Sequence, residues 1–154
     1  MKARVITDKS LTEAVISSCD VCVVGMVDKE NFPYTIPLNF GYHQGVLYLH
    51  TGPSGRKVEV LKNNPKVCIV MSTDHKMYHQ SEEVACSYGM RYKSVMIKGE
   101  IEFITNMDEK INALNIIMKN YSPKADFQYS EPALKNVNVM RVVPASIECK
   151  FFGY

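Results

Sequence analysis

The chain has 154 residues, of which 46% are hydrophobic and 22% charged, and its formal net charge is +2. This length and composition predict one globular domain with a proper core, spanning residues 1–154. A charge so near neutrality gives no reason to expect nucleic acid or a membrane surface as a partner, and no apolar run approaches the roughly 20 residues of a membrane-spanning helix.

The first third of the chain contains one helix signal and then a series of strand signals. The stretch Ser10-Leu-Thr-Glu13 has the pattern of a capping box, which predicts a short helix over residues 11–18. Strands are predicted over 21–27, 34–40 and 46–51, separated by the short turns DKENF and GYHQG. Connections this short favour antiparallel pairing of neighbouring strands.

The rest of the chain alternates strands with helices. A short helix is predicted after Gly55, ending at Asn64-Pro65, and a strand over 66–73 follows it. Residues 74–90 are polar and aperiodic, which predicts a long loop. Further on, we expect a strand over 91–104 with a bulge or bend at Gly99. A helix capped by Asn106 follows, with an apolar stripe from Ile111 to Tyr121. The chain should end with a helical turn from Ser130 and two strands separated by Pro144.

The pattern contains about six to seven short antiparallel strands with two or three peripheral helices. Such a sheet tends to close into a barrel, because closure removes its unpaired edges. The alternation is too irregular for a doubly wound parallel sheet, and the sequence has neither a GxGxxG motif nor a P-loop. We therefore predict a mainly β fold.

Five cysteines are scattered along the chain: Cys19, Cys22, Cys68, Cys86 and Cys149. Their odd number and irregular spacing indicate a reduced, cytoplasmic protein, and the basic start MKARVITDKS has no apolar core of a signal peptide behind it. Cys19-x-x-Cys22 has the spacing of half a zinc or redox site but no second pair, and His75 and His79 have no clear third ligand. We therefore expect no metal site.

The stretch YLHTGPSGRKVEVL, residues 48–61, has features of an anion site. Its glycines let backbone N–H groups approach an anion, and the start of the predicted helix adds free donors and the positive end of the dipole. Arg56 can contact a phosphate through two nitrogens, Lys57 adds a point charge, and Thr51 and Ser54 offer hydroxyls. Cations at a helix N-terminus oppose the dipole by roughly 0.3–1 kcal/mol each, so a bound anion would relieve a conflict. A solvated basic pair beside an ordinary glycine turn is the alternative.

Residues 34–39 form a second candidate, because a strand presents its side chains to two faces in turn. Tyr34, Ile36 and Leu38 share one face of the predicted strand, and Thr35, Pro37 and Asn39 share the other. One face can therefore pack in the core while the other lines a flat slot.

Four stretches follow one another along the chain: Pro33-Tyr-x-Ile-Pro-Leu-Asn39-Phe, Leu47-Tyr48-x-His50, Gly55-Arg56-Lys57 and Tyr92-x-Ser94-Val95-x-x-x-Gly99. In this order, and with a turn at Gly45, they resemble the flavin-binding split-barrel family that includes the pyridoxamine 5′-phosphate oxidases. The resemblance is nearest to the subgroup of nitroimidazole-resistance proteins and covers residues 20–150. It implies a split β-barrel that forms a homodimer and binds FMN at the subunit interface.

The resemblance also implies roles for single residues. Arg56 and Lys57 would hold the FMN phosphate with help from Thr51 or Ser54. The strand from Tyr34 to Asn39 would lie along the isoalloxazine ring, with its backbone hydrogen-bonded to the polar edge of the ring and Pro37, which has no N–H, shaping the contact.

Three further residues follow from the same resemblance. Ser94 falls where the oxidases contact the cofactor with a polar residue, although it could be an ordinary strand serine. Asn39 stands where the oxidases carry a basic residue, which puts the oxidase substrate in doubt; a turn cap is its alternative role. His50 would contact the substrate and protonate or orient it, or it could simply pair with a carbonyl of the barrel.

The sequence thus predicts an FMN-dependent oxidoreductase that accepts electrons from NAD(P)H or another donor and passes them to a small molecule such as a nitroaromatic. No convincing nucleophile or acid–base pair is evident, and flavin chemistry does not require one. The alternatives are a non-catalytic flavin- or haem-binding module, with His75 or His79 as a haem ligand, and a barrel without any cofactor.

Overall fold

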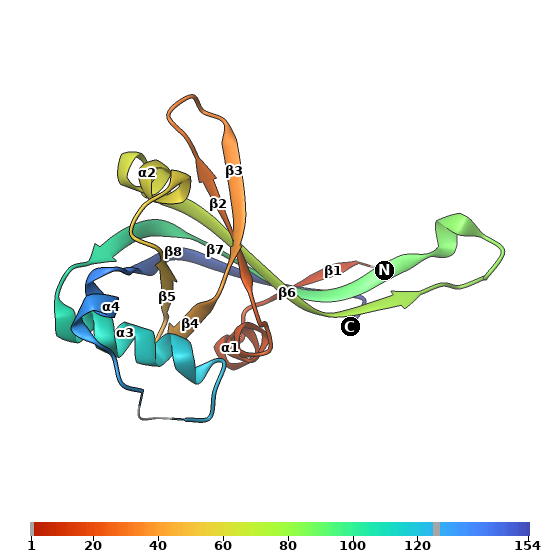
Figure 1. Ribbon diagram of the computed structural model, residues 1–154. Coiled ribbons are helices and arrows are strands. Elements are labelled where there is room, and N and C mark those ends of the chain that lie inside the picture. Colours follow the sequence, from red (N-terminus) through yellow and green to blue (C-terminus); the bar gives the residue numbers. More distant parts are fainter. Residues whose placement is uncertain (1, 125–126) are drawn as a thin grey trace.

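One antiparallel sheet organises the chain (Figure 1). The computed structural model describes residues 2–124 and 127–154. The strands are β1 (Ala3–Ile6), β2 (Cys22–Val27), β3 (Pro33–Leu38), β4 (Phe40–His43), β5 (Val46–Thr51), β6 (Lys66–Tyr78), β7 (Gly89–Ile104) and β8 (Asn138–Phe152). The helices are α1 (Lys9–Ser17), α2 (Arg56–Asn63), α3 (Met107–Lys119) and α4 (Glu131–Lys135), with a 3-10 turn, η1, at Ala85–Ser87.

The two edges of the sheet meet at one residue. The strand order is β3-β2-β6-β7-β8-β5-β4, with β1 paired to the end of β8. The edge strands β3 and β4 are nevertheless consecutive in the chain and are joined through Asn39 alone. The sheet therefore has to curl on itself, and this confirms the predicted mainly β split barrel.

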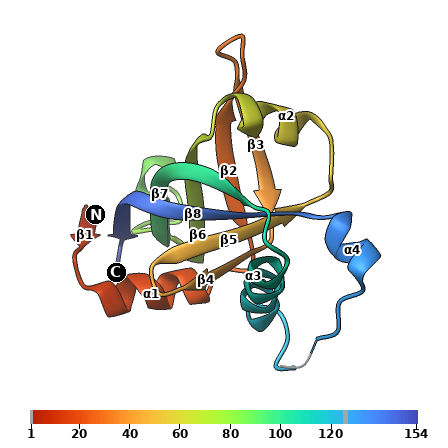
Figure 2. The ribbon, with the colours of Figure 1, turned by 90° about the vertical axis from the view of Figure 1, so that its left-hand side faces the viewer.

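Helices close the ends of the curled sheet. Both views place α2 near one end, and α1 and α3 near the other (Figures 1 and 2). Val60 and Leu61 of α2 and Ile16 of α1 pack into the main core inside the barrel. The apolar stripe of α3 packs instead in a second cluster, with the partly buried Tyr48 of β5 at its border.

Glycine brings α3 very close to the sheet. A Cβ atom added at Gly41 of β4 would lie 2.7 Å from both the Cα and the N atom of Ile117. At the end of the same helical region, the hydroxyl of Tyr121 accepts a hydrogen bond from the N–H of Phe40 (2.9 Å) and donates one to the carbonyl of Asp20 (2.8 Å). These contacts fix the start of β4, and with it the corner at Asn39.

Several predicted boundaries need correction. The first helix begins at Lys9, because Asp8 rather than Ser10 is its cap: an Asp8 carboxylate oxygen accepts from the N–H of Leu11 at 3.1 Å. The predicted strand 34–40 is divided at Asn39. The turn predicted over 41–45 is confined to its last two residues, both with positive φ, while the residues before them form β4.

The loop predicted over residues 74–90 is too long, because only residues 79–88, which include η1, lie outside the strands. β6 continues to Tyr78 and β7 begins at Gly89, and the two form a long hairpin that projects from the barrel (Figure 1). The ring of Tyr78 covers Gly89, and the guanidinium of Arg91 lies 5.4 Å from the centre of that ring. These cross-strand contacts stabilise a sequence whose polarity suggested no regular structure.

The last two predicted strands are one strand, β8, which continues through Pro144. Its pairing with β7 shifts between Lys98 and Gly99, so the predicted irregularity at Gly99 is confirmed. The register shift accommodates the proline within the sheet. Strand β1, which has no strong sequence signal, forms by pairing Ala3–Ile6 with the end of β8. No helix in the described part of the chain is long and apolar enough to cross a membrane.

Candidate functional site

The end of β5, the loop after it and the start of α2 form the first part of the site, and we call residues 51–57 the anion loop after the role that the sequence predicts for them. Gly55 has a φ of 113° and precedes α2 without any side-chain cap. Its carbonyl accepts from the N–H groups of Val58 (2.9 Å) and Glu59 (3.2 Å), so the N–H groups of Arg56 and Lys57 are the ones that the missing cap leaves without an acceptor. The loop is held from the other side by Asn138 of β8. Its side-chain amide donates to the carbonyls of Gly52 (3.1 Å) and Pro53 (3.0 Å).

Asn138 was missed by the sequence analysis. It lies 86 residues from Gly52 in the chain, and only the pairing of β5 with β8, which places Asn138 opposite Thr51, brings it to the loop. A single asparagine in a strand pattern carries no local signal for such a role.

Two polar atoms at the end of β5 lack hydrogen-bond partners within the described residues: Nδ1 of His50 and Oγ1 of Thr51, both buried. Leaving a polar atom buried and unpaired costs about 1–3 kcal/mol, so these atoms are suited to a ligand. They belong to consecutive strand residues and therefore point to opposite faces of β5, which means that one ligand group cannot satisfy both. Burial, and then the charge of Lys57, lower the pKa of His50, so its imidazole is neutral at pH 7.

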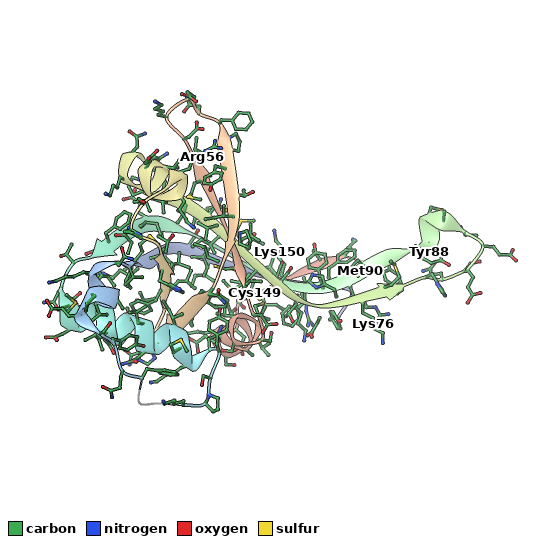
Figure 3. The ribbon with its side chains drawn as sticks, viewed as in Figure 1. Arg56, Lys76, Tyr88, Met90, Cys149 and Lys150 are labelled. Carbon is green, nitrogen blue, oxygen red and sulfur yellow. The ribbon has the colours of Figure 1, made fainter. Side chains whose placement is uncertain are left out.

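The two predicted phosphate ligands reach different neighbours. Arg56 lies between α2 and the β2–β3 hairpin (Figure 3), with its Nη2 3.3 Å from Oδ2 of Asp28 and its guanidinium 4.6 Å from the centre of the Tyr34 ring. Hydrogen bonds from the N–H groups of Phe32 and Glu30, and then from Arg56, hold the pKa of the Asp28 carboxyl below its usual value. Lys57, in contrast, is close enough to His50 to affect its titration.

Strand β3 supplies the second part of the site. It is the terminal strand of the sheet, so one edge of its backbone is unpaired. Tyr34, Ile36 and Leu38 pack against the core while Thr35, Pro37 and Asn39 are exposed, as the alternation predicted. Pro37 is tolerated here because an edge strand can lack one N–H donor.

The exposed side of β3 belongs to a larger sheet surface, which we call the outer face. It is made of residues from four neighbouring strands that share one side of the sheet: Val23, Val27, Thr35, Pro37, Val70 and Met96. A hollow of about 570 Å³ opens beside Gly25 and Cys68 on this face. At Gly25 a Cβ atom would lie 3.0 Å from the carbonyl oxygen of Cys68, so a side chain there would meet the neighbouring strand.

Ser94 lies on the outer face but far from the anion loop of its own chain. It pairs with Ser72 and Lys150, whereas His50 is opposite Val139, which pairs with Ile104. Ser94 is therefore ten residues away along β7, on the order of 30 Å along the strand. The chain by itself does not bring Ser94 together with Arg56 and Lys57.

The residues considered as metal or haem ligands are dispersed. Nε2 of His75 is 3.1 Å from the hydroxyl of Ser72, and His79 packs edge-on against Tyr88 near the tip of the hairpin. Within residues 2–124 and 127–154, no three His, Cys, Asp or Glu side chains gather as a metal site would require. Burial raises the pKa of Cys22 to about 12, so this thiol is not activated for redox chemistry.

Fold and site together define a split barrel with a basic loop at a helix start and an exposed edge strand. The chain belongs to the pyridoxamine 5′-phosphate oxidase family, whose sequence profile matches residues 8–151. A candidate 5-nitroimidazole antibiotic resistance protein from Bacteroides thetaiotaomicron has a similar crystal structure, with 46% identity and a TM-score of 0.88 over 98% of this chain and 88% of that chain.

Two more distant structures share the fold. The flavocytochrome Anf3 from Azotobacter vinelandii is 19% identical with a TM-score of 0.83, over 99% of this chain and 70% of that one. A FAD- and haem-binding protein from Mycobacterium smegmatis is 16% identical with a TM-score of 0.85, over 100% of this chain and 75% of that one. A search of curated proteins found no match.

Proposed function

We propose that the protein is an FMN-dependent oxidoreductase. The observation that carries this proposal is the anion loop: an uncapped helix start with Arg56 and Lys57, directly after a strand end with two buried, unpaired polar atoms, on His50 and Thr51. FMN has a dianionic phosphate at one end and a flat ring at the other, and so needs an anion site next to a slot. Family membership supports a flavin as the ligand.

The residues would divide the cofactor between them. The N–H groups at the start of α2, Lys57, Arg56 and the hydroxyl of Thr51 or Ser54 would hold the phosphate, with Arg56 turning from Asp28 to reach it. The unpaired backbone edge of β3 would hydrogen-bond the polar edge of the ring. When bound, the flavin supplies the hydride chemistry, which the side chains do not have to provide.

The neutral imidazole of His50 would orient the acceptor through a hydrogen bond. Because its lowered pKa leaves it without an acidic proton at pH 7, we assign it orientation of the acceptor rather than protonation. We infer a small nitroaromatic as the acceptor and NADH or NADPH as the donor. The acceptor is supported by the 46% identity with a candidate 5-nitroimidazole resistance protein. Asn39 stands where the oxidases carry a basic residue, so the slot of this chain has one cation fewer. This difference argues against a pyridoxamine 5′-phosphate substrate.

We also propose that the working unit is a homodimer. Ser94 is predicted to contact the flavin, yet it lies on the order of 30 Å along β7 from the level of its own anion loop. A second copy can supply a Ser94 from the opposite side of the slot. This arrangement would reconcile the predicted role of Ser94 with its position in the fold.

A visible spectrum of the purified protein, recorded before and after incubation with FMN and gel filtration, tests the cofactor. The proposal predicts the two-banded absorption of a bound flavin; a Soret band instead would indicate haem, and a colourless protein after incubation would overturn the proposal. Anaerobic addition of NADH or NADPH should bleach the flavin, and a 5-nitroimidazole should restore its colour. A bound flavin that neither donor bleaches would indicate a non-catalytic carrier.

A further inference from the structure

The turn between β2 and β3 carries a carboxylate that lies against the start of α2. Asp28 directly follows β2, and its side chain is 11% exposed. The side chains of the next two residues, Lys29 and Glu30, are 77% and 74% exposed and extend into solvent. A carboxylate with so little access to water needs partners in the protein, and Asp28 has two kinds of partner.

The two oxygens of the Asp28 carboxylate have separate roles. Oδ1 accepts hydrogen bonds from the backbone N–H groups of Glu30 (3.0 Å) and Phe32 (2.9 Å). The backbone N–H of Asp28 also donates to the carbonyl of Phe32 (3.1 Å), so the turn is closed from both sides. Oδ2 instead faces Nη2 of Arg56 at 3.3 Å. The backbone of the turn therefore fixes Oδ2, and the long side chain of Arg56 is the movable partner.

Arg56 is held on the side of α2 that faces the β2–β3 hairpin (Figure 3). Its guanidinium also lies over the ring of Tyr34, 4.6 Å from the ring centre. A cavity of about 420 Å³ lies beside this contact, and its charged lining residues are Asp28, Lys29, Glu30, Arg56 and Glu59. A phosphate on this side would lie among three carboxylates, which would repel it. Lys57 is instead close to His50 of β5, so Arg56 has to leave Asp28 to share a phosphate with Lys57.

We propose that the Arg56–Asp28 ion pair, which we call the latch, competes with the flavin phosphate for Arg56, so that Asp28 sets the affinity for phosphorylated flavins. This inference rests on the proposed FMN site. The latch uses one nitrogen of the guanidinium, whereas a phosphate can accept from two, so the exchange favours the phosphate. Breaking the latch subtracts from the binding free energy of FMN. Riboflavin has no phosphate and leaves the latch closed.

The latch also connects the two ends of the proposed cofactor site. Among the described residues, it is the ion pair that joins the β2–β3 hairpin to α2. Strand β3, whose free edge would hydrogen-bond the flavin ring, belongs to the same hairpin. Arrival of a phosphate at Arg56 therefore releases the hairpin from α2 at the moment when β3 has to fit against the ring.

The substitution Asp28→Asn tests the latch without breaking the turn. The amide oxygen of asparagine can still accept from the N–H groups of Glu30 and Phe32, but its NH₂ group cannot accept from Arg56. We expect the Kd of FMN to fall by roughly two- to fivefold and the Kd of riboflavin to stay unchanged. Glu30→Gln is the matched control, because it removes a charge from the same turn but leaves the latch, and it should change neither Kd.

The gain should depend on Arg56, because the latch acts through its guanidinium. Arg56→Ala and the double variant Asp28→Asn/Arg56→Ala should therefore bind FMN alike. A gain that persists without Arg56, or that also appears in Glu30→Gln, would show a general effect of charge and overturn the latch. FMN binding that is unchanged or weaker in a folded Asp28→Asn protein would overturn it as well.

NMR of the parent protein gives a test that does not depend on the folding of a variant. In protein with ¹⁵N-labelled arginine, FMN should shift the Nε–Hε signal of Arg56 and riboflavin should leave it in place; Arg56→Ala identifies this signal among the arginines. An Arg56 signal that FMN does not move would overturn the latch while leaving the flavin site in place. A parent protein that binds no FMN would overturn the proposed function, and the latch with it.

Discussion

Replacing Arg56 and Lys57 singly by alanine should weaken FMN binding to different extents. A hydrogen bond to a charged group is worth about 1.5–3 kcal/mol. The Arg56 side chain is 59% exposed and already pairs with Asp28, so its contact with phosphate replaces an existing one. We therefore expect its removal to cost about 1–1.5 kcal/mol, or roughly a 5- to 12-fold rise in Kd.

Lys57 should matter more. It is half-buried, and in residues 2–124 and 127–154 it has no ion-pair partner that a phosphate would have to displace. Its loss should cost about 2–3 kcal/mol, or roughly a 30- to 150-fold rise in Kd. The loss in the double variant need not be the sum of the two, because both groups would contact one phosphate.

The assay is a titration that follows the quenching of flavin fluorescence, with FMN and riboflavin in parallel. Riboflavin has no phosphate, so both single variants should bind it as the parent protein does. Lys62→Ala, in the last turn of α2, provides a control for removing a charge from the same helix. Equal losses for FMN and riboflavin, or a larger effect of Arg56→Ala than of Lys57→Ala, would refute the reasoning about the phosphate.

Two further predictions concern stability. Gly41→Ala places a methyl group 2.7 Å from the backbone of Ile117, and we expect a loss of about 3 kcal/mol in the free energy of unfolding by urea. Gly52→Ala is the control, because no atom lies within 4 Å of its new Cβ, and it should change this free energy little. Equal effects of the two substitutions would contradict the close packing of β4 on α3. The folded-state pKa of His50 is lowered from 6.5, so the unfolded chain binds its proton first as pH falls. The free energy of unfolding of the parent protein should therefore decrease as pH drops below about 6.5, and it should decrease less steeply in His50→Gln. Parallel curves of stability against pH for the two proteins would argue against a buried neutral imidazole.

Local patterns in the sequence determined the main elements of the candidate site. The alternation over residues 34–39 places Thr35, Pro37 and Asn39 on the exposed side, because strand geometry depends only on adjacent residues. The glycines and cations after Thr51 mark a loop followed by a helix for the same local reason. The irregularity at Gly99 is also local in origin, since glycine alone fits close to the neighbouring strand.

Only the tertiary structure decided which neighbours these residues meet. The partner of Arg56 is Asp28, 28 residues away, and the anchor of the loop is Asn138, 86 residues from Gly52. The hairpin strands over residues 74–78 and 89–90 were predicted as loop because their stability comes from contacts across two strands, such as Tyr78 on Gly89, and composition along one strand does not reveal them. Strand order and register set such long-range contacts, and they depend on how the whole sheet curls, which no short stretch of sequence encodes.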